Sequence, residues 1–212
     1  VWNDSRNGES DIYFNRSTDG GVTWLAQDVR LDTDGPGNAE SLGPVLCSSG
    51  ENIYVAWVDK ANGAGDIFTN RSLDGGATWL TSARRIESDV PGANVSLDPQ
   101  IACSGPNVYV VWFDDRNGSH DIFFNRSIDH GGTWMQQEVR LDTDILSASS
   151  LVPEIAAFGS NVYVTWYDFR DGPAAVYMNR SEDNGLTWLS DDVPISFPVG
   201  SAPAGNAWVP RI

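Results

Sequence analysis

The sequence predicts an all-β protein, a β-propeller of four-stranded antiparallel blades. Three observations predict this fold. A segment ending in Thr-Trp occurs four times at intervals of about 55 residues, and a second tryptophan recurs at the same interval. The stretches between turns are short and rich in β-branched and aromatic residues, with no convincing helical period. Four short strands in each repeat of this length are the pattern of a propeller blade.

Each unit has the same order of elements. It opens with a strand at a Pro-x-aliphatic segment such as 44–46, and a Gly-x-Asn turn leads to an alternating run such as 53–57. A polar loop follows, then a third run such as 121–126, the segment ending in Thr-Trp, and a fourth extended stretch such as 138–141. The tryptophans of the second runs are expected to fill the space between sheets, because large aromatic side chains bury the most area.

The segment ending in Thr-Trp reads Ser-x-Asp-x-Gly-x-Thr-Trp and predicts a rigid hairpin turn. The aspartate can accept hydrogen bonds from amides of its own turn, and the glycine permits a positive φ. These contacts are local, so we expect a structural role for the motif. Its residues are Ser17, Asp19, Gly21, Thr23 and Trp24; Ser72, Asp74, Gly76, Thr78 and Trp79; Ser127, Asp129, Gly131, Thr133 and Trp134; and Ser181, Asp183, Gly185, Thr187 and Trp188.

The repeat predicts a single domain over residues 1–212. The two end pieces together are about nine residues short of a unit, so a four-bladed ring would leave a backbone edge unpaired. We therefore expect a segment of a larger propeller, and a four-bladed ring with another connection remains the alternative. The units are 1–43 (partial), 44–98, 99–152, 153–209 and 210–212 (the start of the next).

Composition excludes several classes of protein. The net charge of −16 repels phosphate backbones, so nucleic acid is not an expected partner. No apolar run is long enough to span a bilayer. Cys47 and Cys103 occupy adjacent rather than equivalent strand positions, so their side chains are expected to face opposite ways. The sequence thus predicts two buried thiols rather than a disulfide.

The four repeated motifs resemble the Asp-box, or bacterial neuraminidase repeat, proteins, of which the sialidases are the best known. The resemblance implies six blades, with the motifs at the blade periphery on the face away from the active site. It also implies an extracellular, cell-surface or periplasmic location. A sialidase would need an arginine triad, a tyrosine nucleophile with a glutamate partner, and an aspartate acid/base. The Arg-Ile-Pro motif of the first arginine is absent, and Val209-Pro210-Arg211-Ile212 is the nearest segment.

These observations predict a propeller that binds or scaffolds a glycan or protein, without a complete active site in this chain. The alternative is part of an exo-α-sialidase-type glycoside hydrolase, and a third hypothesis is a repeat module for assembly at a cell surface. An Asp-x-Arg pair recurs in the loops of three units, which predicts local salt bridges rather than a converging triad. The pairs are Asp4 with Arg6, Asp114 with Arg116, and Asp168 with Arg170.

A ligand is expected on the face where the units differ. The first strands begin with Val45, Gln100, Glu154 and Arg211 at one equivalent position, whereas the repeated turns hardly vary. An asymmetric ligand needs such differences, so we predict binding around Gln100, Glu154 and Arg211. Tyr167, the one tyrosine that the pattern places in a loop, joins this set.

No cofactor is required by the sequence, but two linkers between blades carry alternating carboxylates. Oxygen ligands of this kind suit Ca²⁺, although the twelve-residue EF-hand pattern is absent. The candidate ligands are Asp32, Asp34, Asp142 and Asp144.

Overall fold

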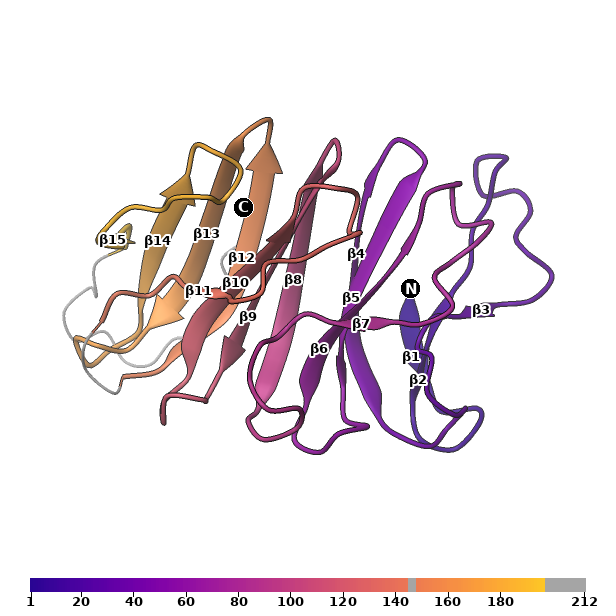
Figure 1. The fold of residues 1–212 in the computed structure, drawn as a ribbon, viewed down its shortest axis with the longest axis horizontal. Helices are drawn as coiled ribbons and strands as arrows, with labels where there is room; N and C mark the ends of the chain where they lie inside the picture. The colour runs from indigo at the N-terminus through magenta and orange to yellow at the C-terminus, as the bar shows by residue number, and fades with distance from the viewer. Residues whose placement is uncertain (145–147, 197–212) are drawn as a thin grey trace.

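A computed structural model describes residues 1–144 and 148–196, which form fifteen strands in four antiparallel sheets (Figure 1). No helix able to span a membrane occurs in these ranges. The first two sheets contain β1 (Trp2–Asp4), β2 (Asp11–Phe14) and β3 (Val29–Arg30), then β4 (Ser41–Ser49), β5 (Asn52–Asp59), β6 (Asp66–Ser72) and β7 (Arg84–Arg85). The other two contain β8 (Ser96–Ser104), β9 (Asn107–Asp114), β10 (Asp121–Ser127) and β11 (Val139–Arg140), then β12 (Ser150–Phe158), β13 (Asn161–Asp168), β14 (Ala175–Ser181) and β15 (Val193–Pro194).

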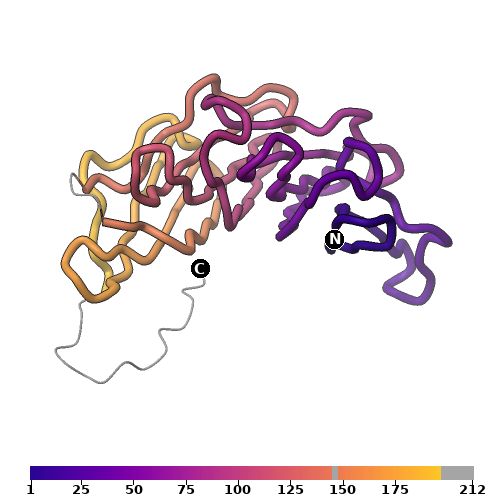
Figure 2. Tube along the Cα trace, turned by 90° about the horizontal axis from the view of Figure 1, so that it is seen from below, coloured from indigo at the N-terminus to yellow at the C-terminus, as the bar shows by residue number. Residues whose placement is uncertain are grey.

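The sheets stand side by side in an arc, and each is a meander in chain order (Figures 1 and 2). The first strands β4, β8 and β12 lie next to one another along the inner side of the arc. The sheet β1–β3 has only three strands. Trp2 of β1 aligns with Trp57 of β5, so β1, β2 and β3 correspond to the second, third and fourth strands of the other sheets. The prediction of an all-β propeller made of antiparallel blades is confirmed.

Tryptophans of the second strands form the core between sheets. Trp57, Trp112 and Trp166 are fully buried. Trp57 and Trp112 stack on the aromatic residues opposite them, Phe68 and Phe123, with ring centroids 6.4 and 6.3 Å apart. Stacking of this kind stabilises the fold beyond what burial of the ring area contributes. The recurring tryptophan therefore has the packing role that the repeat predicts.

The repeated turns, the four Ser-x-Asp-x-Gly-x-Thr-Trp segments, carry the same hydrogen bonds in every sheet. In the third turn the Ser127 hydroxyl donates to Asp129 and accepts from the Gly131 amide, at 2.7 and 2.8 Å. Asp129 also accepts from the amide and hydroxyl of Thr133, both at 2.8 Å. These donors stabilise the charged carboxylate, so the pKa of Asp129 lies well below its usual value.

The prediction of two free thiols is wrong, because Cys47 of β4 and Cys103 of β8 form a disulfide across 6.0 Å between their Cα atoms. Alternation along a strand separates two such side chains only where both strands lie in one sheet, and β4 and β8 belong to different sheets. In a propeller, opposite faces of neighbouring sheets meet. Two cysteines on opposite faces of their own strands can therefore point toward each other, within the usual Cα separation of a disulfide.

Candidate functional site

The connections divide between two faces of the molecule. On one face, the loops after the second strands contact the linkers between sheets, as where the Ala64 amide donates to the Gly92 carbonyl at 3.2 Å. On the other, the repeated turns contact the turns between the first two strands, as where the Gly75 amide donates to Glu51 at 2.7 Å. The first strands begin on the loop-and-linker face, where the sequence predicts a ligand.

A hollow of about 480 Å³ opens between the beginnings of β4 and β8. Its walls are mostly apolar, with one aromatic ring, and Asp98 and Gln100 supply its polar side chains. We refer to it as the β4–β8 hollow. Its lining residues are Leu42, Gly43, Pro44, Val45, Val58, Leu97, Asp98, Pro99, Gln100 and Phe113.

A β-bulge shapes the beginning of each first strand. Strand pairing shifts register between Leu42 and Val45, and again between Leu97 and Gln100. The bulged residues Gly43 and Asp98 have φ angles of 57° and 55°. Glycine adopts this conformation freely, whereas a residue with a side chain is strained there, and such strain is concentrated at functional sites.

The bulge directs a carboxyl and an amide to the same wall. Burial raises the pKa of Asp98, while its hydrogen bond with Gln100 acts in the opposite direction. Together the two side chains offer both donors and acceptors beside the ring of Phe113. A hollow with apolar walls and a few convergent polar groups is the usual form of a small-molecule site.

The structure places the predicted ligand residues as follows. Gln100 lines the β4–β8 hollow. Glu154 is the first paired residue after the equivalent bulge one sheet further along, in β12. Tyr167 lies in β13, opposite Leu151, and not in the predicted loop, because the second strand continues to Asp168. Arg211 is outside the described residues.

Sequence reasoning missed Asp98 and Phe113, although both belong to the hollow. Asp98 immediately precedes Pro99, one of the prolines that open each unit. Phe113 directly follows Trp112, at the position that Tyr167 occupies in the fourth unit. The alignment that singled out Tyr167 could therefore also have pointed to Phe113.

The loop arginines form local ion pairs, as their spacing predicts. Arg170 lies 2.5 Å from Asp168 and 2.6 Å from Asp192, and its guanidinium covers the Tyr177 ring at 4.1 Å from the centroid. Arg116 pairs with Asp114 in the same way, at 2.5 Å. Arg6 and Arg170 pair within their own units, and Arg116 pairs within its own unit and with Asp89 of the preceding linker at 4.0 Å. These side chains do not converge on one substrate.

Three acidic triads lie where the linkers meet the third strands, and the atoms of each could hold a metal ion because they lie within 4.8 Å of one another. An arginine of the fourth strand already lies among the carboxylates. In the first triad, Arg30 is 3.1 Å from Asp11, 2.8 Å from Asp32 and 2.5 Å from Asp34. The three triads are Asp11, Asp32 and Asp34; Asp66, Glu87 and Asp89; and Asp121, Asp142 and Asp144.

In the fourth sheet, other residues stand at the positions of the arginine and of the first two carboxylates. Ala175 and Pro194 occupy the positions of the first aspartate and the arginine, and Ser196 occupies that of the second carboxylate. The Ser196 hydroxyl accepts the Val176 amide at 2.7 Å, as Asp32 accepts the Ile12 amide in the first sheet. The arginine and its carboxylates thus change together, which indicates a shared structural role.

The triads are expected to make the protein less stable as the pH rises. Burial raises the pKa of Asp32 to about 7 and that of Glu87 to about 9. The folded chain then holds protons that the unfolded chain releases above about pH 4, so stability falls between about pH 5 and 9. Glu87→Gln keeps that site neutral and should flatten the fall in melting temperature between pH 6 and 9.

The matched control is Glu9→Gln, which changes an exposed carboxylate and should leave the wild-type pH profile in place. An unchanged slope for Glu87→Gln would show that Glu87 is ionised in the folded protein. Below about pH 4 the direction reverses, because the aspartates of the repeated turns have lowered pKa values and lose their stabilising hydrogen bonds when protonated.

No protein-family model and no curated protein matches this sequence. Among solved structures, it is similar to the Penicillium chrysogenum alpha-L-arabinanase complexed with arabinobiose, at 14% identity and a TM-score of 0.58, over 91% of this chain and 56% of that one. An alpha-L-arabinofuranosidase of Fusarium graminearum matches at 15% identity and a TM-score of 0.55, over 89% of this chain and 56% of that one. A mutant Trypanosoma rangeli sialidase matches at 15% identity and a TM-score of 0.48, over 68% of this chain and 29% of that one. At these identities the first two show the fold alone, a propeller of which this chain spans little more than half the length.

Proposed function

We propose that the protein binds a neutral oligosaccharide in the β4–β8 hollow. The observation that carries the proposal is the pairing of Asp98 with Gln100 beside the ring of Phe113. Sugar hydroxyls need both donors and acceptors, which the carboxyl and the amide supply. The apolar face of a sugar ring can pack on the aromatic ring and on the two prolines, Pro44 and Pro99.

The charge of the site favours a neutral sugar over a sialic acid. None of the residues that line the hollow is a lysine or an arginine. A bound carboxylate would meet Asp98 without a cation, on a protein whose net charge is −16. The arabinobiose-bound neighbour supports the neutral class, because it is a propeller of the same fold that holds an uncharged sugar.

Binding is favoured over hydrolysis. Glycosidases of the usual mechanism place two carboxyl groups on either side of the scissile bond. Asp98 is the one acidic residue among those lining the hollow. We therefore propose a glycan-binding module. A disulfide forms and persists in oxidising compartments, which supports a location outside the cytoplasm.

Calorimetric titration tests this function with arabinobiose and longer arabino-oligosaccharides, and with 3′-sialyllactose as the acidic probe. We expect the neutral sugars to bind and the sialylated one not to. Gln100→Ala and Asp98→Asn should each weaken binding about tenfold, the loss of a hydrogen bond to the ligand. Asparagine tolerates a positive φ, so Asp98→Asn keeps the bulge.

Leu73→Ser is the matched control, because Leu73 is exposed in a repeated turn on the opposite face. It should bind like the wild type. Equal affinity in all three variants would place the site elsewhere. Preference for the sialylated probe, or no binding of any neutral sugar, would overturn the proposal.

A further inference from the structure

Three units of the repeat contain a stack of three side chains on their second and third strands and the loop between them. In the third unit, Trp112 packs on Phe123 with ring centroids 6.3 Å apart, and the Arg116 guanidinium lies 4.2 Å from the Phe123 centroid. The equivalent sets are Trp2, Tyr13 and Arg6 in the first unit, and Trp166, Tyr177 and Arg170 in the fourth.

A buried aspartate holds the arginine in the third and fourth units. Arg116 lies 2.5 Å from Asp114, and Arg170 lies 2.5 Å from Asp168. Burial alone would raise the pKa of both aspartates, and the hydrogen bonds from the arginines hold it below its usual value. The ring and the carboxylate together therefore form a site for a guanidinium group, which pairs with carboxylates and stacks on aromatic rings.

The second unit keeps the ring and the carboxylate but not the arginine. Ala61 stands at the position of Arg116. Trp57 still packs on Phe68, with centroids 6.4 Å apart, and Asp59 is still buried. The side chain of Ala61 ends at Cβ, so it cannot cover the ring or reach the carboxylate as the arginine does.

Phe68 is the most exposed of the four equivalent rings. It is half-buried, and Ala61 beside it is exposed. The other three rings, of Tyr13, Phe123 and Tyr177, are each 6% exposed under their arginines. Solvent therefore reaches the ring of the unit that has no arginine of its own.

Asp59 forms no ion pair with any cation among residues 1–144 and 148–196. Its shortest hydrogen bond comes from the Ala61 amide, at 2.8 Å. The adjacent Lys60 pairs with Glu40 instead, at 2.6 Å. Burial raises the pKa of Asp59, the opposite of the shift at Asp114, where an arginine is present. The carboxylate is thus buried without the cation that its counterparts have.

A linker carboxylate adds negative charge at the same place. Asp89 of the linker before the third sheet lies 4.0 Å from Arg116, and Asp34 is its equivalent before the second sheet. After burial itself, the charge of Asp34 contributes to the raised pKa of Asp59. Ala83 stands where the other stacks have a second carboxylate on the arginine. The second unit therefore retains carboxylates for a cation and has a smaller side chain beside them.

We propose that the second unit binds the guanidinium group of a ligand between Asp59 and the Phe68 ring, where the other three units hold their own arginine. The ligand class is a monoalkylguanidinium, either free arginine or an arginine side chain of a peptide. A guanidinium offers parallel donors to a carboxylate and a flat face to a ring, whereas an ammonium is a compact point charge. The net charge of −16 attracts either cation, so geometry provides the selectivity.

Titration of the ¹⁵N-labelled 212-residue chain with methylguanidinium chloride tests the proposal, with methylammonium chloride at equal ionic strength as the comparison. The Ala61 amide and the Trp57 indole N–H lie beside Asp59 and report on the site. We expect both signals to shift and saturate with methylguanidinium, and to shift far less with methylammonium.

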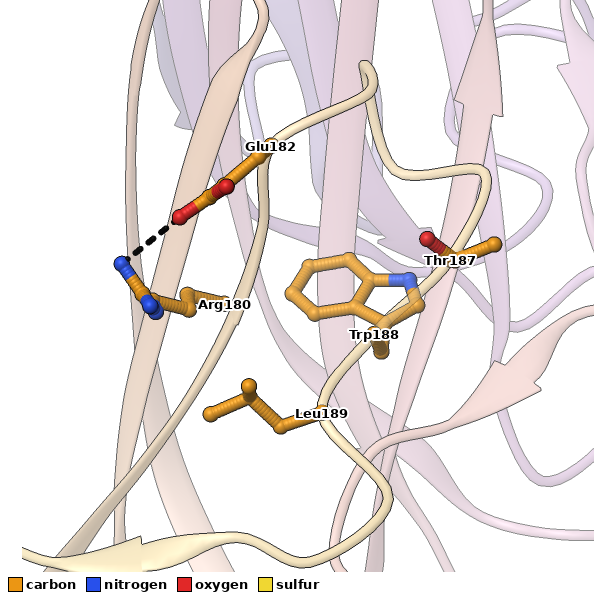
Figure 3. A pocket seen from close by; sticks show the side chains of 5 residues that line it. All are labelled: Arg180, Glu182, Thr187, Trp188 and Leu189. Carbon is orange, nitrogen blue, oxygen red and sulfur yellow. Dashed lines mark ion pairs between the residues drawn. The ribbon is translucent and has the colours of Figure 1, made fainter.

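The Arg180–Glu182 pair is the internal control for unselective ion pairing. Its atoms lie 2.9 Å apart at an exposed surface, and the Arg180 side chain is turned toward Glu182 rather than toward the Trp188 ring (Figure 3). The Glu182 carboxylate therefore has no stacked ring to select a flat cation. Its amide should respond to the two salts alike.

Ala61→Arg supplies the guanidinium within the chain. It should raise the melting temperature by about 2–4 °C and abolish the response to methylguanidinium. Asp59→Asn should weaken binding about tenfold, because it removes the charged acceptor. Glu51→Gln makes the same change of charge at an exposed site on the opposite face, and should bind like the wild type.

Arg116→Ala creates the same arrangement in the third unit. The amide of residue 116, which donates to Asp114, should then respond to methylguanidinium. Acetyl-Gly-Arg-Gly-amide and L-arginine distinguish the two sources of the ligand. Tighter binding of the peptide supports an arginine side chain, and tighter binding of L-arginine supports a small solute.

The absence of a saturable shift at Ala61 and Trp57 would overturn the proposal. Equal shifts with the two salts would also overturn it, because they would show that the ring does not select a guanidinium. A response that persists in Ala61→Arg would show that the cation binds elsewhere.

Discussion

Replacing both Cys47 and Cys103 by alanine is expected to lower the free energy of unfolding by about 4 kcal/mol, measured by urea denaturation. The disulfide joins residues 56 positions apart, and closing a loop of that length removes much of the entropy of the unfolded chain. It also ties β4 to β8, the two strands that wall the β4–β8 hollow. The double variant should therefore also bind the neutral sugar more weakly.

Reductant supplies the matching control for the disulfide. Wild-type protein with dithiothreitol should unfold near the urea midpoint of the double variant, and the double variant should not respond to reductant. A difference of less than about 1 kcal/mol between wild type and double variant would show that the disulfide does not constrain the unfolded chain as its loop length implies.

Gly185→Ala is expected to destabilise the protein by about 1–3 kcal/mol more than Gly21→Ala, the range for overpacking a core. Both glycines have a positive φ, 77° and 89°, so both variants carry the same kind of backbone strain. Only Gly185 lies against a neighbouring sheet, where the new methyl group would collide with Phe124. The difference in urea midpoints thus measures the packing of the inter-sheet junction.

Phe124→Leu offers a way to separate this collision from other effects. A smaller side chain at position 124 should relieve part of the cost of Gly185→Ala, so the two substitutions should be non-additive. Equal destabilisation by Gly185→Ala and Gly21→Ala would show that the turn does not insert against the preceding sheet.

The fold could be predicted because each repeat contains the residues that form its own turn and fill the gap beside its own sheet. Each turn needs its aspartate and glycine for local reasons, and Trp57, Trp112 and Trp166 recur because every gap between sheets needs a large side chain. The disulfide could not be predicted in the same way. It depends on which faces of two different sheets meet, and the alternation of side chains along one strand does not contain that information.

The residues of the proposed site could be predicted only in part. Variation at the beginnings of the first strands pointed to Gln100, which lines the hollow. Asp98 was missed because its bulge and its positive φ arise from strand pairing and leave no local pattern beyond the following proline. The alternating carboxylates of the linkers predict metal ligands, and the structure places them close enough together to hold an ion. The arginine two positions earlier, Arg30 or Arg140, completes an Arg-x-Asp-x-Asp pattern, and its ion pairs with these carboxylates could not be predicted from the aspartates alone.

The most direct test of the proposed glycan site is the change in amide chemical shifts of the ¹⁵N-labelled protein as arabinobiose is added. A ligand in the β4–β8 hollow should shift the amides of residues 42–45 and 97–101, apart from the prolines, and leave those of the repeated turns unchanged. Shifts confined to the repeated turns, or no shifts at saturating sugar, would contradict a neutral-sugar site between β4 and β8.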